Sequence, residues 1–432
     1  MANMTAREQL MLELINRARM DPVAEAERLG VTLAPGQSKP VQVLAGNDML
    51  RTAAYNHSGW MLLNDVFAST QFKGSQSFIA KTALDRMMAY GYKISGQHVY
   101  GENISWVGAD TVPDFTQAIF AQHATLFADG ASRARILRSS FQEVGIGQQA
   151  GGFIDGGQPY VASMVTQDFV RSGSKVFITG VIYSDITDND FYDVGEGVAA
   201  RRVTAKGAPA DIAGPGGGYE LQFGATGIAT MKVALESVTL KLDVALGSTN
   251  VKVDVVNGNE IWTNGSVQSK SAAITELHAL GRSPLVLIGS NAAEEITGNS
   301  AANHLLGQGG NDMIVGGAGK DRLVGGMGGD TLTGGDGADR FIYSKRGESA
   351  AAPDIITDFG NGVDRIDLSD LFTGKLKYRG EGPFAGGHEV SVSAYGAHVL
   401  VHVNLDRDLA DVMVIVLANV SLSELSKGDF IL

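Results

Sequence analysis

The sequence predicts a multidomain α+β protein with an N-terminal αβα sandwich, a central antiparallel β-sandwich and a C-terminal parallel β-roll. Three observations support this fold class. Apolar residues over 1–172 recur first at helical spacing and then in two strand-like runs. Over 173–283, apolar and polar residues alternate with a period of two between glycine-rich turns. Residues 284–432 contain a glycine-rich repeat. A length of 432 residues fits three such domains.

The composition is that of folded domains, and it excludes several kinds of partner. Hydrophobic residues make up 44% and charged residues 19%, which is enough apolar surface for real cores. The net charge of −13 argues against nucleic acid and anionic membranes as partners. No apolar run approaches the roughly 18 residues of a transmembrane helix, and no cleavable secretory signal is visible. The absence of cysteine excludes disulfides and thiolate metal sites.

The first segment, 1–172, begins with a helix that starts at a capping box formed by Thr5 and Glu8 and ends at Pro22. A second helix places His57 on its apolar side, and a fourth does the same with His123. The later helices are expected at about Met49–Phe67, at Thr82–Tyr90 and from about Pro113, and the strands at Glu143–Gln149 and Tyr160–Phe169.

Seven stretches follow one another in this segment: LELINRARMDP, AAYNHS, LDRMMAYGY, GENI, AIFAQHATLF, FQEVGIG and VTQDF. Together they resemble the CAP superfamily of cysteine-rich secretory, antigen 5 and pathogenesis-related proteins, whose domains are also called SCP-like. The resemblance implies that His57, Glu102 and His123 line one cavity, in which several members bind a divalent metal such as zinc. The fourth position of that cavity stays open between Ser69, Asp65 and His98.

Two functions follow from such a cleft. Two imidazoles and a carboxylate are a common zinc set with an open water position, so His57, Glu102 and His123 could serve an extracellular hydrolase of peptide or ester bonds. A histidine on an apolar helical face is, however, more often a hydrogen-bonded core residue. Because neither G-x-S-x-G nor H-E-x-x-H is present, we favour a cleft that binds a ligand such as a lipid, sterol or peptide.

The central segment, 173–283, contains four alternating runs: KVFITGVIYSD, GGYELQFG, TLKLDVAL and NVKVDVV. It resembles carboxypeptidase-regulatory-like sandwiches, which are usually spacers or binding modules. Its loop DITDNDFYDVGE has the oxygen spacing of an EF-hand loop and resembles the calcium loops of B-type repeats in bacterial surface proteins. The ligands would be Asp185, Thr187, Asn189, the Phe191 carbonyl, Asp193 and Glu196. Asp190 stands where an EF-hand has glycine, and an acidic solvated hairpin is the alternative.

The glycine-rich stretch is a repeat of nine residues that starts at Gly289 and continues without a slip to Ile342. The sixth position is acidic or Asn and the eighth is apolar. Because two nonapeptides make one coil, residues 18 apart stack, so Asp312 should face Asp330. Such like charges repel unless a cation such as Ca²⁺ binds between them. A flexible linker would not hold this register. The predicted calcium ligands are Gly307, Gly309, Asp312, Gly316, Gly317, Gly319, Asp321, Gly325, Gly326, Gly328, Asp330, Gly334, Gly335, Gly337 and Asp339.

This repeat resembles the RTX (hemolysin-type calcium-binding) nonapeptide family. Asp354–Phe372 and the final LANVSLSELSKGDFIL resemble the region after the repeats in serralysin-type secreted proteins. The resemblance implies a calcium-binding β-roll followed by a β region that carries the signal for a type I secretion apparatus. The protein would then be extracellular or attached to the cell surface, unfolded before export and folded by calcium afterwards. An adhesin or matrix protein is a third possible function.

Overall fold

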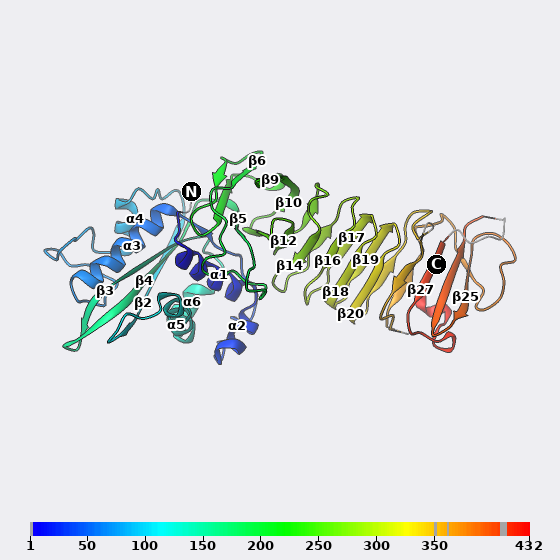
Figure 1. The fold of residues 1–432 in the computed structure, drawn as a ribbon, viewed down its shortest axis with the longest axis horizontal. Helices are drawn as coiled ribbons and strands as arrows, with labels where there is room; N and C mark the ends of the chain where they lie inside the picture. The colour runs from blue at the N-terminus through cyan, green and yellow to red at the C-terminus, as the bar shows by residue number, and fades with distance from the viewer. Residues whose placement is uncertain (1–2, 350–351, 361–362, 407–412) are drawn as a thin grey trace. The chain divides into compact units, whose positions relative to one another are not determined.

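The computed structural model describes residues 3–349, 352–360, 363–406 and 413–432, and it divides into two compact units (Figure 1). The N-terminal unit comprises Met1–Thr239 and Ala245–Gly258, and the C-terminal unit comprises Leu240–Val244 and Asn259–Leu432. The boundaries expected at 172/173 and 283/284 do not coincide with this division. Most of the central segment belongs to the N-terminal unit, whereas 259–283 belongs with the repeats. Positions 361–362 of the predicted post-repeat segment lie outside the described residues.

The described α-helices all lie in the N-terminal unit, and most of the remaining regular structure is β. The first helix, α1 (Ala6–Met20), begins at the predicted capping box, in which the Thr5 amide donates to Glu8 Oε2 at 2.8 Å. Pro22 starts a second helix, α2 (Pro22–Leu29), where its missing amide hydrogen costs nothing. The others are α3 (Asp48–Leu63), α4 (Ala83–Ala89), α5 (Phe115–Ala128) and α6 (Gly130–Ile136). No helix among the described residues is long and apolar enough to cross a bilayer.

A four-stranded sheet positions the predicted cleft residues. Its order is β1-β3-β4-β2, with β1 (Ala45–Gly46), β2 (His98–Ala109), β3 (Glu143–Asp155) and β4 (Gln158–Ser172). A Cβ on Gly145 or Gly147 would lie 2.0 Å from the backbone of α3, so glycine allows this helix to pack directly on the sheet. The long strand β2 was not expected from the sequence, and it brings Glu102 directly opposite Asp168 of β4.

The rest of the N-terminal unit is a mixed β structure. It contains β5 (Val176–Tyr183), β6 (Arg202–Ala205), β7 (Asp211–Ile212), β8 (Gly218–Phe223), β9 (Gly227–Ala234) and β11 (Val251–Val256). β5 pairs antiparallel with β8 but parallel with β11. The prediction of a purely antiparallel sandwich is therefore wrong. The long excursion between β5 and β11 is what allows them to run in the same direction.

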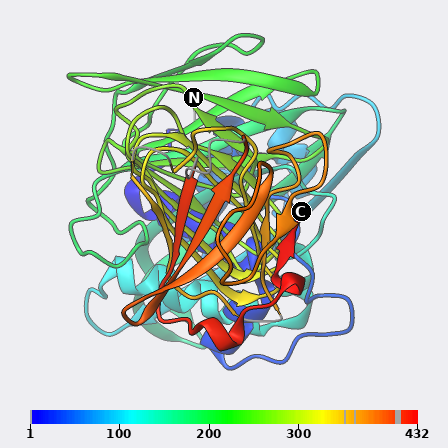
Figure 2. The same cartoon turned by 90° about the vertical axis from the view of Figure 1, so that its right-hand side faces the viewer.

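The C-terminal unit is built from two stacks of short parallel strands. One stack is β12 (Glu260–Thr263), β14 (Glu276–Ala279), β16 (Glu295–Thr297), β18 (Met313–Gly319), β20 (Thr331–Gly337), β22 (Asp354–Ile356) and β27 (Met413–Leu417). The other is β13 (Val267–Ser269), β15 (Val286–Ile288), β17 (His304–Gly309), β19 (Arg322–Met327), β21 (Arg340–Ile342), β23 (Arg365–Asp367) and β28 (Phe430–Ile431). Residues of β10 (Thr239–Leu246) pair antiparallel with β13. The hairpin of β25 (Glu389–Tyr395) and β26 (His398–Asn404) pairs with β27 and, on its other side, with β24 (Lys377–Tyr378) (Figure 2).

The register of the stacks confirms the 18-residue coil, since Ile314 pairs with Leu332 and Leu305 pairs with Leu323. The eighth residue of each repeat points inward and is fully or almost fully buried. The same ladder continues upstream to Leu277 and Ile261, neither of which lies in a glycine-rich repeat. The β-roll therefore begins near Glu260, earlier than the sequence predicted.

Candidate functional site

The sixth residues of the repeats form two columns along the roll, and Asp354 and Asp364, which follow the repeats, extend them. One contains Glu294, Asp312, Asp330 and Asp354, and the other contains Asn303, Asp321, Asp339 and Asp364. Every aspartate of the two columns accepts a hydrogen bond from a backbone amide of the preceding coil, whereas Glu294 accepts from Ser290 of its own turn. The amide of Asp312 donates to Asp330 Oδ1 at 2.9 Å, and that of Asp321 donates to Asp339 Oδ1 at 2.8 Å. The carboxylates thus stack as the repeat predicts.

In most of these carboxylates the second oxygen has no hydrogen-bond partner, although Asp364 Oδ2 accepts from the Gly360 amide at 2.7 Å. This holds for Oδ2 of the four repeat aspartates, whose exposed fractions are 2% or less, and for Oδ2 of Asp354. An unpaired buried carboxylate oxygen is costly. Burial, with repulsion from neighbouring carboxylates, raises the pKa of Asp312 and Asp354 to about 7 and that of Asp321 to about 6. A bound cation would relieve both penalties.

The first glycine of each repeat makes room for that oxygen. A Cβ on Gly307 would lie 2.1 Å from Asp312 Oδ2 and 2.5 Å from the Gly325 carbonyl oxygen of the next coil. On Gly325, a Cβ would lie 2.2 Å from Asp330 Oδ2. Carboxylate and carbonyl oxygens therefore meet at each turn, and this is the all-oxygen environment that suits Ca²⁺. Left-handed backbone angles are found at Gly317, Gly319, Gly326, Gly328, Gly335 and Gly337. Gly309 does not have to be glycine for space, because a Cβ at this position would lie no closer than 3.5 Å to its nearest neighbour.

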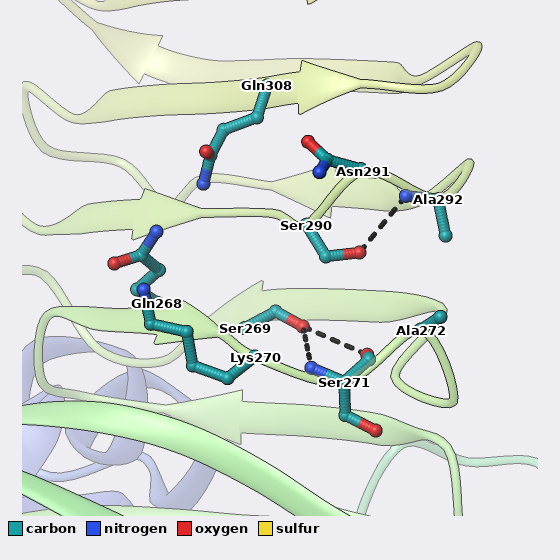
Figure 3. Close-up of a pocket in the computed structure, with 9 residues that line it drawn as sticks. All are labelled: Gln268, Ser269, Lys270, Ser271, Ala272, Ser290, Asn291, Ala292 and Gln308. Carbon is teal, nitrogen blue, oxygen red and sulfur yellow. Dashed lines mark hydrogen bonds between the residues drawn. The ribbon is translucent and has the colours of Figure 1, made fainter.

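In the two degenerate repeats, side-chain amides donate to turn carbonyls, whereas Glu294 Oε2 has no hydrogen-bond partner. Asn303 stands in an aspartate position, and its Nδ2 donates to the Ala301 carbonyl at 2.5 Å. Gln308 Nε2 similarly donates to the Gly289 carbonyl at 2.9 Å. Gln308 lines a polar recess of about 390 Å³ together with Gln268 and Asn291 (Figure 3). These carbonyls are therefore already hydrogen-bonded to an amide nitrogen.

The EF-hand-like loop gathers its three predicted carboxylate ligands around the Thr187 hydroxyl. Thr187 Oγ1 lies 3.4 Å from Asp185 Oδ1, 3.1 Å from Asp193 Oδ2 and 3.3 Å from Glu196 Oε1. The amide group of Asn189 donates to Asp193 at 2.8 Å. Asp190 adopts the left-handed conformation, with φ of 58°, that glycine would supply in an EF-hand. The aspartate at the sixth position therefore does not prevent the turn.

In the N-terminal unit, His57 lies in a buried polar cluster with Arg86, Glu102 and Asp168. His57 Nε2 is 3.8 Å from Glu102 Oε1, and the Arg86 guanidinium contacts the other Glu102 oxygen. Burial, with the charge of Arg86, lowers the pKa of His57 to about 3. Burial also raises the pKa of Glu102 and, together with the charge of Glu102, that of Asp168. The imidazole is therefore neutral at pH 7.

His123 does not join this cluster. Its Nε2 bonds to Glu25 Oε1 of α2 at 2.9 Å, and Glu25 also pairs with Arg17. The ligand atoms of His57, Glu102 and His123 do not form a group within 4.8 Å of one another. The Arg86 cation beside Glu102 further opposes a second cation there. The predicted three-residue zinc set is thus not assembled.

The three candidates for the fourth position have other roles. The Ser69 carbonyl accepts from Arg86 at 3.3 Å, and Asp65 accepts from the Ile154 amide at 2.8 Å. His98 is exposed and lines a different recess with Arg171. The cluster residues that sequence reasoning missed are Arg86 and Asp168. Arg86 lies in the stretch LDRMMAYGY and Asp168 lies in VTQDF, two of the stretches that carry the resemblance.

Residues 295–431 match the protein family described as Peptidase M10 serralysin C terminal. This segment is therefore similar to the C-terminal domain of serralysin-type proteins. Such a domain indicates a secreted, calcium-binding RTX-type protein. No curated protein sequence matches the chain significantly.

Solved structures similar to parts of the chain include two subunits of a mannuronan C5-epimerase from Azotobacter vinelandii. The AlgE6R3 subunit is 33% identical over 33% of this chain and 80% of its own, with a TM-score of 0.28. The AlgE6R2 subunit is 28% identical over 32% and 92%, with a TM-score of 0.25. An extracellular Bacillus anthracis protein containing an SCP domain is 19% identical over 38% of this chain and 40% of its own, with a TM-score of 0.25.

Proposed function

We propose that this is a secreted binding protein that is exported through a type I secretion apparatus and whose C-terminal unit is then folded by calcium. The observation that carries this proposal is the row of buried, unpartnered Oδ2 atoms at Asp312, Asp321, Asp330 and Asp339, each beside a glycine turn. These oxygens disfavour the folded roll when calcium is scarce. Where calcium is abundant, the same oxygens make binding and folding one event.

Calcium titration of the full chain tests the proposal. Far-UV circular dichroism should show a gain of β signal as Ca²⁺ rises through roughly 10⁻⁴–10⁻³ M, the range of extracellular calcium modules. Mg²⁺ should not replace it, because that smaller ion demands octahedral geometry and keeps its waters. Native mass spectrometry should report several retained calcium ions. An equally folded C-terminal unit in EGTA would contradict the proposal.

We also propose that the N-terminal unit is a CAP-like module that binds a ligand, such as a lipid, sterol or peptide. The binding function is favoured over hydrolysis because His123 is held by Glu25 and the His57 cluster has an arginine in place of a second imidazole. Native mass spectrometry of the calcium-folded protein should then find a co-purified small molecule and no zinc in the His57 cluster. A zinc-dependent hydrolytic activity that is lost in both His57→Ala and His123→Ala would overturn this view.

The EF-hand-like loop is proposed as a separate calcium site in the N-terminal unit. Its support is the convergence of three carboxylates on Thr187 Oγ1. Glu196→Gln should remove one calcium ion from the native mass spectrum and leave those of the roll in place. The exposed Glu236→Gln, in the same unit, serves as the control. Unchanged calcium stoichiometry in Glu196→Gln would show that the loop is only an acidic hairpin.

A further inference from the structure

The solvent-facing surface of the first coils carries a group of metal-ligating side chains that is separate from the two columns of stacked carboxylates. β12 and β14 pair in parallel, which places Glu260 beside Glu276 and Trp262 beside His278. One ligand atom from each of Glu260, Glu276 and His278 lies within 4.8 Å of the other two. Around one ion with metal–ligand bonds of about 2.0–2.2 Å, ligand atoms lie within about 4.4 Å of one another, so small side-chain movements would bring this group onto a divalent ion.

The group is held in place by the indole of Trp262. The imidazole of His278 stacks on that indole at 4.4 Å with an interplanar angle of 26°. The indole Nε1 donates to Glu260 Oε2 at 3.3 Å, and His278 Nε2 lies 3.1 Å from Glu276 Oε2. The side chains of Glu276 and His278 are 34% and 14% exposed, so an ion can reach them from solvent. The ligands are therefore oriented in advance yet accessible.

We propose that Glu260, Glu276 and His278 bind a divalent transition metal of the zinc class. Two carboxylates and one imidazole are a mixed set that suits Zn²⁺, Ni²⁺ or Cu²⁺, whereas Ca²⁺ takes oxygen ligands. A dication also relieves the repulsion between carboxylates that stand side by side in a ladder. Glu295 of β16 adds to this repulsion, because it pairs with Glu276 in the neighbouring strand.

A simple ion pair accounts for less of this geometry. A protonated His278 would attract Glu276, but it would not explain why the Trp262 bond brings Glu260 to the same point. The site is also independent of the two carboxylate columns, because its ligands lie on β12 and β14, upstream of the glycine-rich repeats. It therefore goes beyond the proposed function and can be tested while calcium is saturating.

The test uses the full chain in excess Ca²⁺, with isothermal titration by Zn²⁺. Wild type should bind one zinc ion that excess Ca²⁺ does not displace. His278→Gln and Glu276→Gln should weaken binding by about tenfold or more, since loss of even an outer-shell partner costs that much. The matched control is His304→Gln, which removes a half-buried histidine of β17 and should bind zinc as wild type does. Unaltered zinc affinity in His278→Gln would overturn the proposal.

Tryptophan fluorescence gives a second readout that depends on position. Cu²⁺ or Ni²⁺ bound at His278 should quench Trp262, one of three tryptophans in the chain. Trp262→Phe should abolish the saturable quenching but still bind zinc, with an affinity about tenfold lower because the indole bond to Glu260 is lost. Quenching that persists in Trp262→Phe would place the metal elsewhere. Calcium-dependent circular dichroism of every variant shows that the roll is folded.

Discussion

Replacing Asp312 with asparagine should change the stability of the roll in opposite directions with and without calcium. Asp312 Oδ1 accepts from the Glu294 amide at 2.9 Å, and an asparagine oxygen would keep that bond. The new amide nitrogen would take the place of the unpartnered Oδ2 and could donate to a turn carbonyl. Asn303 already does this, with Ala301 as its acceptor. Without calcium, the variant should therefore be the more stable protein.

The size of the stability gain expected for Asp312→Asn in EGTA follows from the pKa of Asp312, which burial raises from 3.8 to about 7. A pKa difference of about 3 means that the charged carboxylate destabilises the folded roll by at most about 4 kcal/mol. Solvent at the edge of the turn screens part of it, so we expect a gain of about 2 kcal/mol in EGTA at pH 8. With calcium at a hundred times its dissociation constant, loss of one site should instead cost about 2.7 kcal/mol.

Urea unfolding of the full chain, followed by far-UV circular dichroism in EGTA and in calcium, measures both effects. If the EGTA form is too unstable for a full transition, the residual β signal in EGTA should be larger in Asp312→Asn than in wild type. Asp336→Asn removes the same charge from an exposed position of β20 and is the matched control, expected to change neither state by more than a few tenths of a kcal/mol. Equal destabilisation by Asp312→Asn in both conditions would refute the argument from the unpartnered oxygen.

Three further predictions follow from the same geometry. Because the pKa values of Asp312, Asp354 and Asp321 are raised in the fold, protonation of these carboxylates stabilises the calcium-free roll. This stabilisation should be complete below pH about 4 and lost as the pH rises to 7. Far-UV circular dichroism in EGTA should therefore show more β signal at pH 5 than at pH 8, and a flat profile would contradict this. Gly307→Ala should lower calcium affinity in a titration because its Cβ would collide with Asp312, whereas Gly309→Ala, with 3.5 Å of clearance, should not. His123→Ala should cost the N-terminal unit about 1–3 kcal/mol in thermal unfolding by breaking the buried bond to Glu25, while the exposed His98→Ala should cost almost nothing.

The roll could be predicted where its signals are local. Glycine turns, a sixth-position acid and an eighth-position apolar residue recur every nine residues, so the register of Asp312 on Asp330 follows from counting. The coils at Ile261 and Leu277 lack these glycines. Their alternation of apolar and polar residues is the same in a sandwich strand and in a roll strand, so the sequence could not place them in the roll. Asp354 could have been found, because it stands two residues before a buried Ile356 as the repeat acids do.

The N-terminal site was harder to predict because it depends on contacts between distant elements. Helical spacing places His123 on a buried face, but it does not say that α2 brings Glu25 to meet it. Likewise, the pairing of Glu102 with Asp168 depends on the register of β2 with β4. A shift of one residue would send these side chains to opposite faces. Periodicity identifies the face a residue occupies, not its partner across the core.

The hydrogen bonds between the coils have a polarity. From Glu294 onward, each coil donates backbone amides to carboxylates supplied by the coil that follows it, as Asp330 does to Asp354 and Asp339 does to Asp364. Removing a downstream coil leaves buried donors without acceptors, whereas removing an upstream coil leaves an acceptor that water or a cation can satisfy. Assembly of the roll should therefore propagate toward the N-terminus, with each finished coil serving as the template for the one before it.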